Sequence, residues 1–159
     1  MNKKAVVDVS YLLLVGMTAG AVAVLGALVA AVVFHSESYL SVPLLSRYEE
    51  GKIMGEIFLR FSYWGYFMVL VITVYELYRY KRMQIDRISL LSALGAVGTL
   101  LLFSGVYTPR ILEYQSRGES AIDAGFEALH KASEIDFKIL LLTLLILFGR
   151  RAYLMAVKR

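Results

Sequence analysis

The sequence contains no cysteine, which excludes disulfide bonds, thiolate metal sites and redox chemistry at thiols. Histidine is also scarce, since only two occur among 159 residues, too few to define a metal coordination sphere by themselves. Neither a nucleophile-elbow motif nor a phosphate-binding glycine loop is present. Because no catalytic constellation is found, we expect that the protein is not an enzyme.

Charge is absent from long stretches of the chain, and this absence is the most informative one. No Asp, Glu, Lys, Arg or His lies between Asp8 and His35. Three further apolar runs cover residues 57–77, 88–107 and 139–149. A helix crosses the apolar part of a bilayer with ~20 residues. We therefore predict an all-α integral membrane protein with four transmembrane helices in an antiparallel bundle. The spans are expected at about residues 9–34, 57–80, 88–107 and 132–152 of a single domain, residues 1–159.

The charged residues between the apolar runs alternate in sign along the chain. The segments after the first and third runs are acidic, whereas the segment between runs two and three and the C-terminal tail are basic. The basic residues are Arg79, Lys81, Arg82, Arg87, Arg150, Arg151, Lys158 and Arg159. Basic segments stay on the cytoplasmic side, so we predict cytoplasmic N- and C-termini in a bacterial inner membrane, with an uncleaved first span. Topology and anionic lipids also explain the net charge of +4, so we expect no nucleic-acid partner.

Helices two and four are predicted to begin before their apolar runs and to extend on the outer side of the membrane. Ser46 and Glu49 have the spacing of a capping box, and Glu56 and Arg60 can pair four residues apart. A helix that starts after this cap and runs to about residue 80 would be ~50 Å long. Span three is predicted to end at residue 107 because Pro109 follows, with an outer loop over residues 110–119.

Small residues recur every four positions in span one and at the start of helix two. Such ridges let a neighbouring helix backbone approach closely. We expect both ridges to pack within the bundle, with a dimer interface as the alternative for span one, and we expect Val22 to face lipid. The ridge residues are Gly16, Gly20, Ala19, Ala23, Ala27 and Ala31 in span one, and Gly51 and Gly55 in helix two.

Two acids, Glu50 and Asp136, fall on the apolar stripes of helices two and four. A buried acid in a membrane protein must be paired, protonated or in contact with a wet cavity. The candidate partners for a structural role are Arg60, Lys138, Arg110 or a tyrosine hydroxyl. The alternative is a functional cation or proton site formed by Glu50, Glu56, Asp136 and His130, with Glu56 as a third candidate buried acid.

At the opposite end of helix two, Glu76 is the only acid, and Arg79 lies three residues further on. Residues three apart share one face of a helix. We therefore predict a structural pair between Glu76 and Arg79.

Both histidines are predicted to lie on the outer side of the membrane. His130 precedes Glu134 by four residues, so the two share a helix face, and His35 ends span one. Imidazole and carboxylate suit zinc, copper or another divalent ion, so a metal site formed by His130, Glu134 and His35 is one interpretation. A solvated or salt-bridged His130 is the other. A haem group is disfavoured, because both histidines lie on one side and could hold it only near the surface.

Two stretches carry a resemblance to a known family: residues 48–64, YEEGKIMGEIFLRFSYW, and residues 129–138, LHKASEIDFK. With four spans and a small-residue first helix, the chain resembles a bacterial four-span membrane family of unknown function. That family is similar to transmembrane protein 205-like proteins and distantly to copper resistance D-like membrane proteins. The resemblance implies a small inner-membrane bundle and carries no established reaction, catalytic residue or cofactor.

Two functions remain for such a bundle. The first is ion or metal handling, or transport, through an acidic vestibule on the outer face, indicated by Glu50, Asp136 and His130. The second is an accessory or structural subunit of a larger membrane complex, or a homo-oligomer, indicated by the glycine and alanine ridges. An enzyme ranks third. The bilayer is the one partner that the sequence predicts directly.

Overall fold

A computed structural model describes residues 3–39, 45–84 and 86–157, and they form helices joined by short connections. In chain order the first part is α1 (Lys3–Val24), a π-helical segment (Leu25–Val29), α2 (Ala30–Val33), a 3₁₀ turn (Ser36–Ser38) and α3 (Arg47–Lys81). The second part is α4 (Arg87–Leu102), a second π-helical segment (Phe103–Tyr107), α5 (Thr108–Ser116), a 3₁₀ turn (Glu119–Ala121) and α6 (Ala124–Val157).

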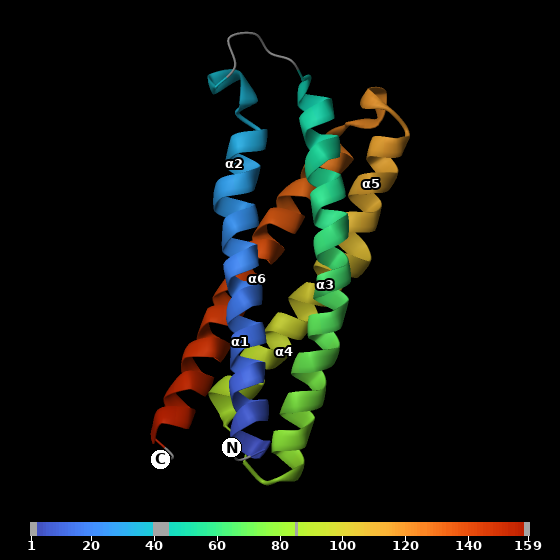
Figure 1. The fold of residues 1–159 in the computed structure, drawn as a ribbon. Coiled ribbons are helices and arrows are strands. Elements are labelled where there is room, and N and C mark those ends of the chain that lie inside the picture. Colours follow the sequence, from blue (N-terminus) through green and yellow to red (C-terminus); the bar gives the residue numbers. More distant parts are fainter. Residues whose placement is uncertain (1–2, 40–44, 85, 158–159) are drawn as a thin grey trace.

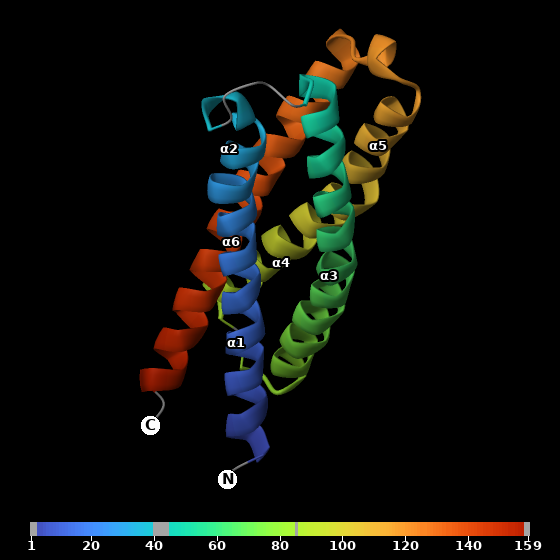
Figure 2. The ribbon, with the colours of Figure 1, turned by 45° about the horizontal axis from the view of Figure 1, so that its top comes forward.

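These elements combine into four long helices that are apolar enough to cross a membrane: Lys3–Val33, Arg47–Lys81, Arg87–Ser116 and Ala124–Val157. Consecutive long helices run in opposite directions (Figures 1 and 2). The predicted all-α, four-helix architecture is thereby confirmed. Both termini lie at one end of the bundle, here called the termini end, together with the connection between α3 and α4. The end of α2, the start of α3 and the α5–α6 connection lie at the other end, here called the far end.

Local capping explains why α3 and α6 begin before their apolar runs. The Ser46 hydroxyl accepts from the Glu49 amide at 3.3 Å, and the Glu49 carboxylate accepts from the Ser46 amide at 2.7 Å. This is the capping box that the spacing predicts. The Asp123 carboxylate accepts from the amides of Gly125 and Phe126 at 2.8 and 3.0 Å at the start of α6. Side-chain acceptors therefore satisfy amides that a helix start leaves open.

The third long helix does not end before Pro109, and this prediction is wrong. The helix continues through α5 to Ser116, so most of the expected outer loop is helical. Proline lacks an amide hydrogen and clashes with the carbonyl four residues earlier, which here belongs to Gly105. The preceding π-helical segment relieves this conflict, because its wider turn bonds the Thr108 amide to the carbonyl of Phe103, five residues back.

Four phenylalanines pack together in the middle of the bundle. Phe58 and Phe61 come from α3, Phe103 from the second π-helical segment and Phe137 from α6. Their ring centroids lie 4.7 to 6.1 Å apart, mostly edge to face. Each such pair contributes about 0.5–1.5 kcal/mol beyond the area that it buries. A Cβ at Gly26 would lie 3.5 Å from the Phe137 ring, so the first π-helical segment borders this cluster too.

Close packing through glycine is confirmed where α1 meets α6 and where α3 meets α5. A Cβ at Gly16 would lie 2.9 Å from the Phe148 ring, and one at Gly55 only 2.6 Å from the Gln115 side chain. At Gly51 the same glutamine would be 3.4 Å away. Ala19 is buried, as predicted. These four small residues therefore set how near the neighbouring helices lie.

The rest of the ridge on span one does not pack within the bundle, which corrects the prediction. Ala27 and Ala31 are exposed, Ala23 is half-buried, and nothing lies within 4 Å of a Cβ at Gly20. Val22, expected to face lipid, is only 1% exposed. Four residues turn a helix about 40° past a full turn, so a strict four-residue ridge leaves the packed face. The buried positions instead alternate steps of four and three residues: Tyr11, Val15, Thr18 and Val22.

Candidate functional site

Glu50 is buried at the far end, as predicted, but its partners are local ones. The carboxylate is 3% exposed, accepts a hydrogen bond from the Ser36 hydroxyl and lies 3.6 Å from the Arg47 guanidinium. Arg60 instead bonds Glu56 at 2.8 Å on the surface, which confirms the predicted pair four residues apart. Glu56 is exposed, so its assignment as a buried acid is wrong.

Asp136 is also buried, but its environment differs from that of Glu50. It is 7% exposed on the packed face of α6, and its Oδ2 atom accepts no hydrogen bond from the residues that the structure describes. Neither Arg60 nor Lys138, two of the expected partners, pairs with Asp136. Arg60 bonds Glu56, and Lys138 Nζ lies 3.9 Å from Glu134 Oε2 on the exposed side. Its chain neighbour, Phe137, belongs to the phenylalanine cluster. Asp136 is therefore a buried carboxyl at the border of an aromatic cluster.

The residues of the expected metal site do not come together. His130 Nε2 lies 3.4 Å from Glu134 Oε1, and the His130 ring stacks on Phe126 at 5.9 Å. The His35 ring nitrogen bonds the Ala31 carbonyl at 2.9 Å. Within residues 3–39, 45–84 and 86–157, no three His, Cys, Asp or Glu side chains cluster closely enough to hold a metal ion. The His130–Glu134 pair is present, but it lacks a third ligand.

The termini end contains a buried ionic network that joins three helices. Glu76, from α3, accepts from the Tyr11 hydroxyl at 3.0 Å and from Arg151 Nε at 3.0 Å, and a second Arg151 nitrogen bonds its other oxygen. The pair between Glu76 and Arg79 that the sequence predicts is wrong. Arg79 instead lies 3.7 Å from Asp8 of α1. Both α3 residues point into the bundle, where other helices offer partners with better geometry than the helix's own side chains.

Tyrosines hold this network in place. The Tyr75 hydroxyl donates to Asp8 at 2.8 Å, and the Tyr75 ring stacks on the Tyr11 ring with centroids 3.6 Å apart. The guanidinium groups of Arg79 and Arg151 lie 6.0 and 5.6 Å from the Tyr75 ring centroid. Cation–π contact and ion pairing therefore act on the same two arginines.

A second ion pair lies beside this network. Arg150 of α6 bonds Asp86 at 2.7 Å, and Asp86 also accepts from the amide and hydroxyl of Ser89, at 2.9 Å each, which caps α4. The Arg150 guanidinium, helped by the Ser89 donors, holds the pKa of Asp86 well below its usual range. Asp86 is therefore ionised at neutral pH and ties the start of α4 to the end of α6.

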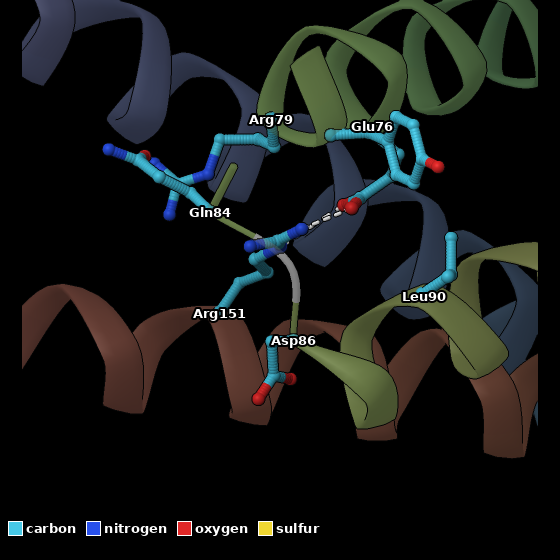
Figure 3. A pocket seen from close by; sticks show the side chains of 7 residues that line it. Glu76, Arg79, Gln84, Asp86, Leu90 and Arg151 are labelled. Carbon is cyan, nitrogen blue, oxygen red and sulfur yellow. Dashed lines mark hydrogen bonds and ion pairs between the residues drawn. The ribbon is translucent and has the colours of Figure 1, made fainter. Parts of the chain in front are cut away.

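A small pocket opens between these two ionic groups. Its lining residues are Glu76, Arg79, Tyr80, Gln84, Asp86, Leu90 and Arg151, and its volume is about 10 Å³. Figure 3 shows Arg151 reaching across from α6 to Glu76, with Asp86 on the other side. Two buried nitrogens of this lining have no hydrogen-bond partner among the described residues: Arg79 Nε and Arg151 Nη1.

From the sequence, Arg151 is interpreted only as one of the basic residues that set the topology, and no contact is predicted for Asp8, so the place of both in this network was missed. A signal was nevertheless available. Arg151 continues the buried stripe of α6, four residues after Leu147 and seven after Leu144. A charged residue on an apolar stripe is the pattern that identified Asp136, and it applies equally to Arg151.

Comparison with known proteins gives one positive result. Searches of curated proteins and of solved structures found no match. The likeness to transmembrane protein 205-like and copper resistance D-like proteins has no support in these comparisons. Residues 13–120, more than half of the 159-residue chain, match a family described as a domain of unknown function (DUF4149). The chain therefore belongs to the DUF4149 family.

Proposed function

We propose that this protein is an integral membrane protein that binds or moves a proton or a cation through Asp136. The observation that supports this proposal is the buried Asp136 carboxyl, which has an oxygen without a partner among the described residues. A carboxylate within a membrane bundle needs a compensating proton, cation, hydrogen bond or water. Such a residue is a common mark of an ion or proton pathway.

A proton or a partly hydrated monovalent cation fits this site better than zinc or copper. Structural zinc takes four protein ligands and catalytic zinc three, whereas the described part of the chain gathers no such group around Asp136. The nearby buried hydroxyl of Ser133 already donates to the His130 carbonyl at 2.7 Å, but its oxygen can still accept. We therefore place divalent-metal binding behind proton or monovalent-cation binding.

The orientation is part of the proposal. The exposed cations Lys81, Arg82 and Arg87 lie at the termini end, and the positive-inside rule places that end in the cytoplasm of a bacterial cell. Asp136 would then be reached from the outer side of the membrane. Single cysteines at Ser38 and Ser116 should react with an impermeant thiol reagent added to whole cells, whereas a cysteine at Met83 should not. The reverse pattern would contradict this orientation.

The function is tested by Asp136→Asn in proteoliposomes that contain a pH-sensitive dye for protons or a potassium-sensitive dye for potassium. The parent protein should dissipate an imposed proton or potassium gradient faster than protein-free vesicles, and Asp136→Asn should reduce the rate to background. Asp123→Asn is the matched control, because Asp123 is exposed and asparagine also caps helices. Infrared difference spectra between acidic and neutral pH should show a buried carboxyl band that Asp136→Asn lacks. A parent protein with neither the flux nor the band would refute the proposal.

One observation favours a second candidate, an accessory subunit of a membrane complex or a homo-oligomer. The small residues Gly20, Ala27 and Ala31 are uncovered within the described chain, and such residues are what a second helix packs against. Ala27→Leu should then reduce the mass of the complex extracted from native membranes in mild detergent. Leu28→Phe, at an exposed position one residue further on, should leave the mass unchanged. Equal masses for all three proteins would exclude this candidate.

A further inference from the structure

The pocket at the termini end is lined by two buried cations, each with one donor that no described residue accepts. The Arg79 and Arg151 side chains are 8% and 4% exposed, and their free nitrogens are Nε and Nη1 respectively. They come from different helices, α3 and α6, and both line the same small space (Figure 3). A buried donor without an acceptor is costly, more so when it is charged. Two such donors, on residues that line one pocket, leave a place there for an acceptor that the described residues do not supply.

The acids around this pocket are already engaged. Glu76 accepts from Tyr11 and Arg151, and Asp86 accepts from Arg150 and Ser89. Asp8 outside the lining accepts from Tyr75 and pairs with Arg79. Three acids and three arginines therefore balance within the network, and the missing component is a hydrogen-bond acceptor. Since both unused donors are positively charged, an anionic oxygen is the acceptor that satisfies them best.

The surface beside the pocket is positive. Lys81, Arg82 and Arg87 are exposed on the connection between α3 and α4, which also supplies the lining residue Gln84. Since the buried charges cancel, these surface cations set the sign of the local potential. A pocket between helices with exposed cations beside it, next to the ends of two candidate spans, resembles the basic sites that recognise anionic headgroups.

We propose that this pocket binds a phosphate group, with one phosphate oxygen inserted between Arg79 and Arg151. The volume of about 10 Å³ admits one oxygen, so the rest of the phosphate stays at the mouth, near Lys81 and Arg82. The group can belong to an anionic phospholipid or to free phosphate. The lining residues Tyr80 and Leu90 favour the lipid, because they offer apolar contact where its glycerol and acyl chains would lie.

The test is the thermal stability of the purified full-length protein in detergent, with defined additions. Phosphatidylglycerol should raise the melting temperature by several degrees, as expected for a ligand of the folded state, whereas phosphatidylcholine should not. Inorganic phosphate, compared with chloride at equal ionic strength, forms the second arm. A rise with the lipid alone assigns the site to a headgroup, and a rise with inorganic phosphate as well extends it to free phosphate. No rise with either would overturn the proposal.

Variants connect the effect to the two arginines. Arg79→Lys and Arg151→Lys keep one positive charge each but lose the free guanidinium donor, so the apparent affinity should fall about tenfold, the loss expected for one charge-assisted hydrogen bond. Arg60→Lys is the matched control and should change it little, because Arg60 is exposed, pairs with Glu56 and does not line the pocket. Unchanged affinity in both pocket variants would overturn the proposal. If these variants fail to fold, native mass spectrometry of the parent protein provides the test. The protein is extracted from vesicles that contain equal amounts of phosphatidylglycerol and phosphatidylcholine, and it should retain mainly phosphatidylglycerol. Equal retention of the two lipids would overturn the proposal.

Discussion

Glu76→Leu should be one of the most destabilising substitutions outside the apolar core. The Arg151 side chain is 4% exposed and the Glu76 side chain 9%, so the substitution leaves a buried guanidinium without its carboxylate. It also removes the acceptor of the Tyr11 hydroxyl. Removing one partner of a buried ion pair costs about 3–5 kcal/mol. That loss is a large part of the total stability of a typical domain, about 5–15 kcal/mol. Titration with sodium dodecyl sulfate from dodecyl maltoside micelles, followed by circular dichroism, measures it.

The double variant Glu76→Leu/Arg151→Met separates pairing from packing. Because it leaves neither charge buried alone, it should be more stable than Glu76→Leu by about 2 kcal/mol or more. Glu56→Leu is the control on the same helix, since its pair with Arg60 is exposed and contributes about 0.5 kcal/mol or less. If the losses from the two single substitutions simply add, or if Glu76→Leu costs no more than Glu56→Leu, the network does not act as described.

Three further predictions concern other contacts. Gly16→Leu should cost about 1–3 kcal/mol through overpacking, whereas Gly20→Leu, with open space, should be neutral or stabilising in the same unfolding titration. Thr18→Val should leave the indole N–H of Trp64 without its acceptor at 3.0 Å, which costs about 0.5–1.5 kcal/mol and shifts the fluorescence of the only tryptophan. The pKa of Asp86 is lowered in the folded protein, so the parent should be more stable than Asp86→Asn at pH values above the ordinary carboxyl pKa of about 4. This difference in stability should disappear as the pH falls below that value. A difference that stays constant at every pH would contradict the ion pair.

The parts of the fold that depend on neighbouring residues in the chain could be predicted from the sequence. Apolar length predicts the four long helices, and the Ser46–Glu49 spacing predicts where α3 begins, because both signals act within a few residues. Pro109 misled the prediction for the same reason. The rule that proline ends helices is local, but a π-helical turn before it accommodates the ring.

Contacts between helices could be predicted less well, because they depend on how the helices dock. Burial of Glu50 and Asp136 follows from their place on apolar stripes and is confirmed. The contacts of Glu50 with Ser36 and Arg47 were not predicted. The pairing of Glu76 with Arg151 joins residues 75 positions apart, and a rule for residues three apart could not find it. The exposed alanines of span one show how a small error in helical phase grows over several turns.

The contacts of the last helix have a consequence for how the protein is made. Arg150 and Arg151 reach back to acids that lie 64 and 75 positions earlier, and α6 follows the other long helices in the chain. While the earlier helices enter the bilayer, Glu76 and Asp86 therefore lack these cationic partners and face lipid or water instead. Arrival of α6 supplies both arginines at once, so docking of this helix completes the charge balance of the termini end. A nascent chain that stops short of Arg150 is consequently expected to remain loosely packed and open to proteolysis.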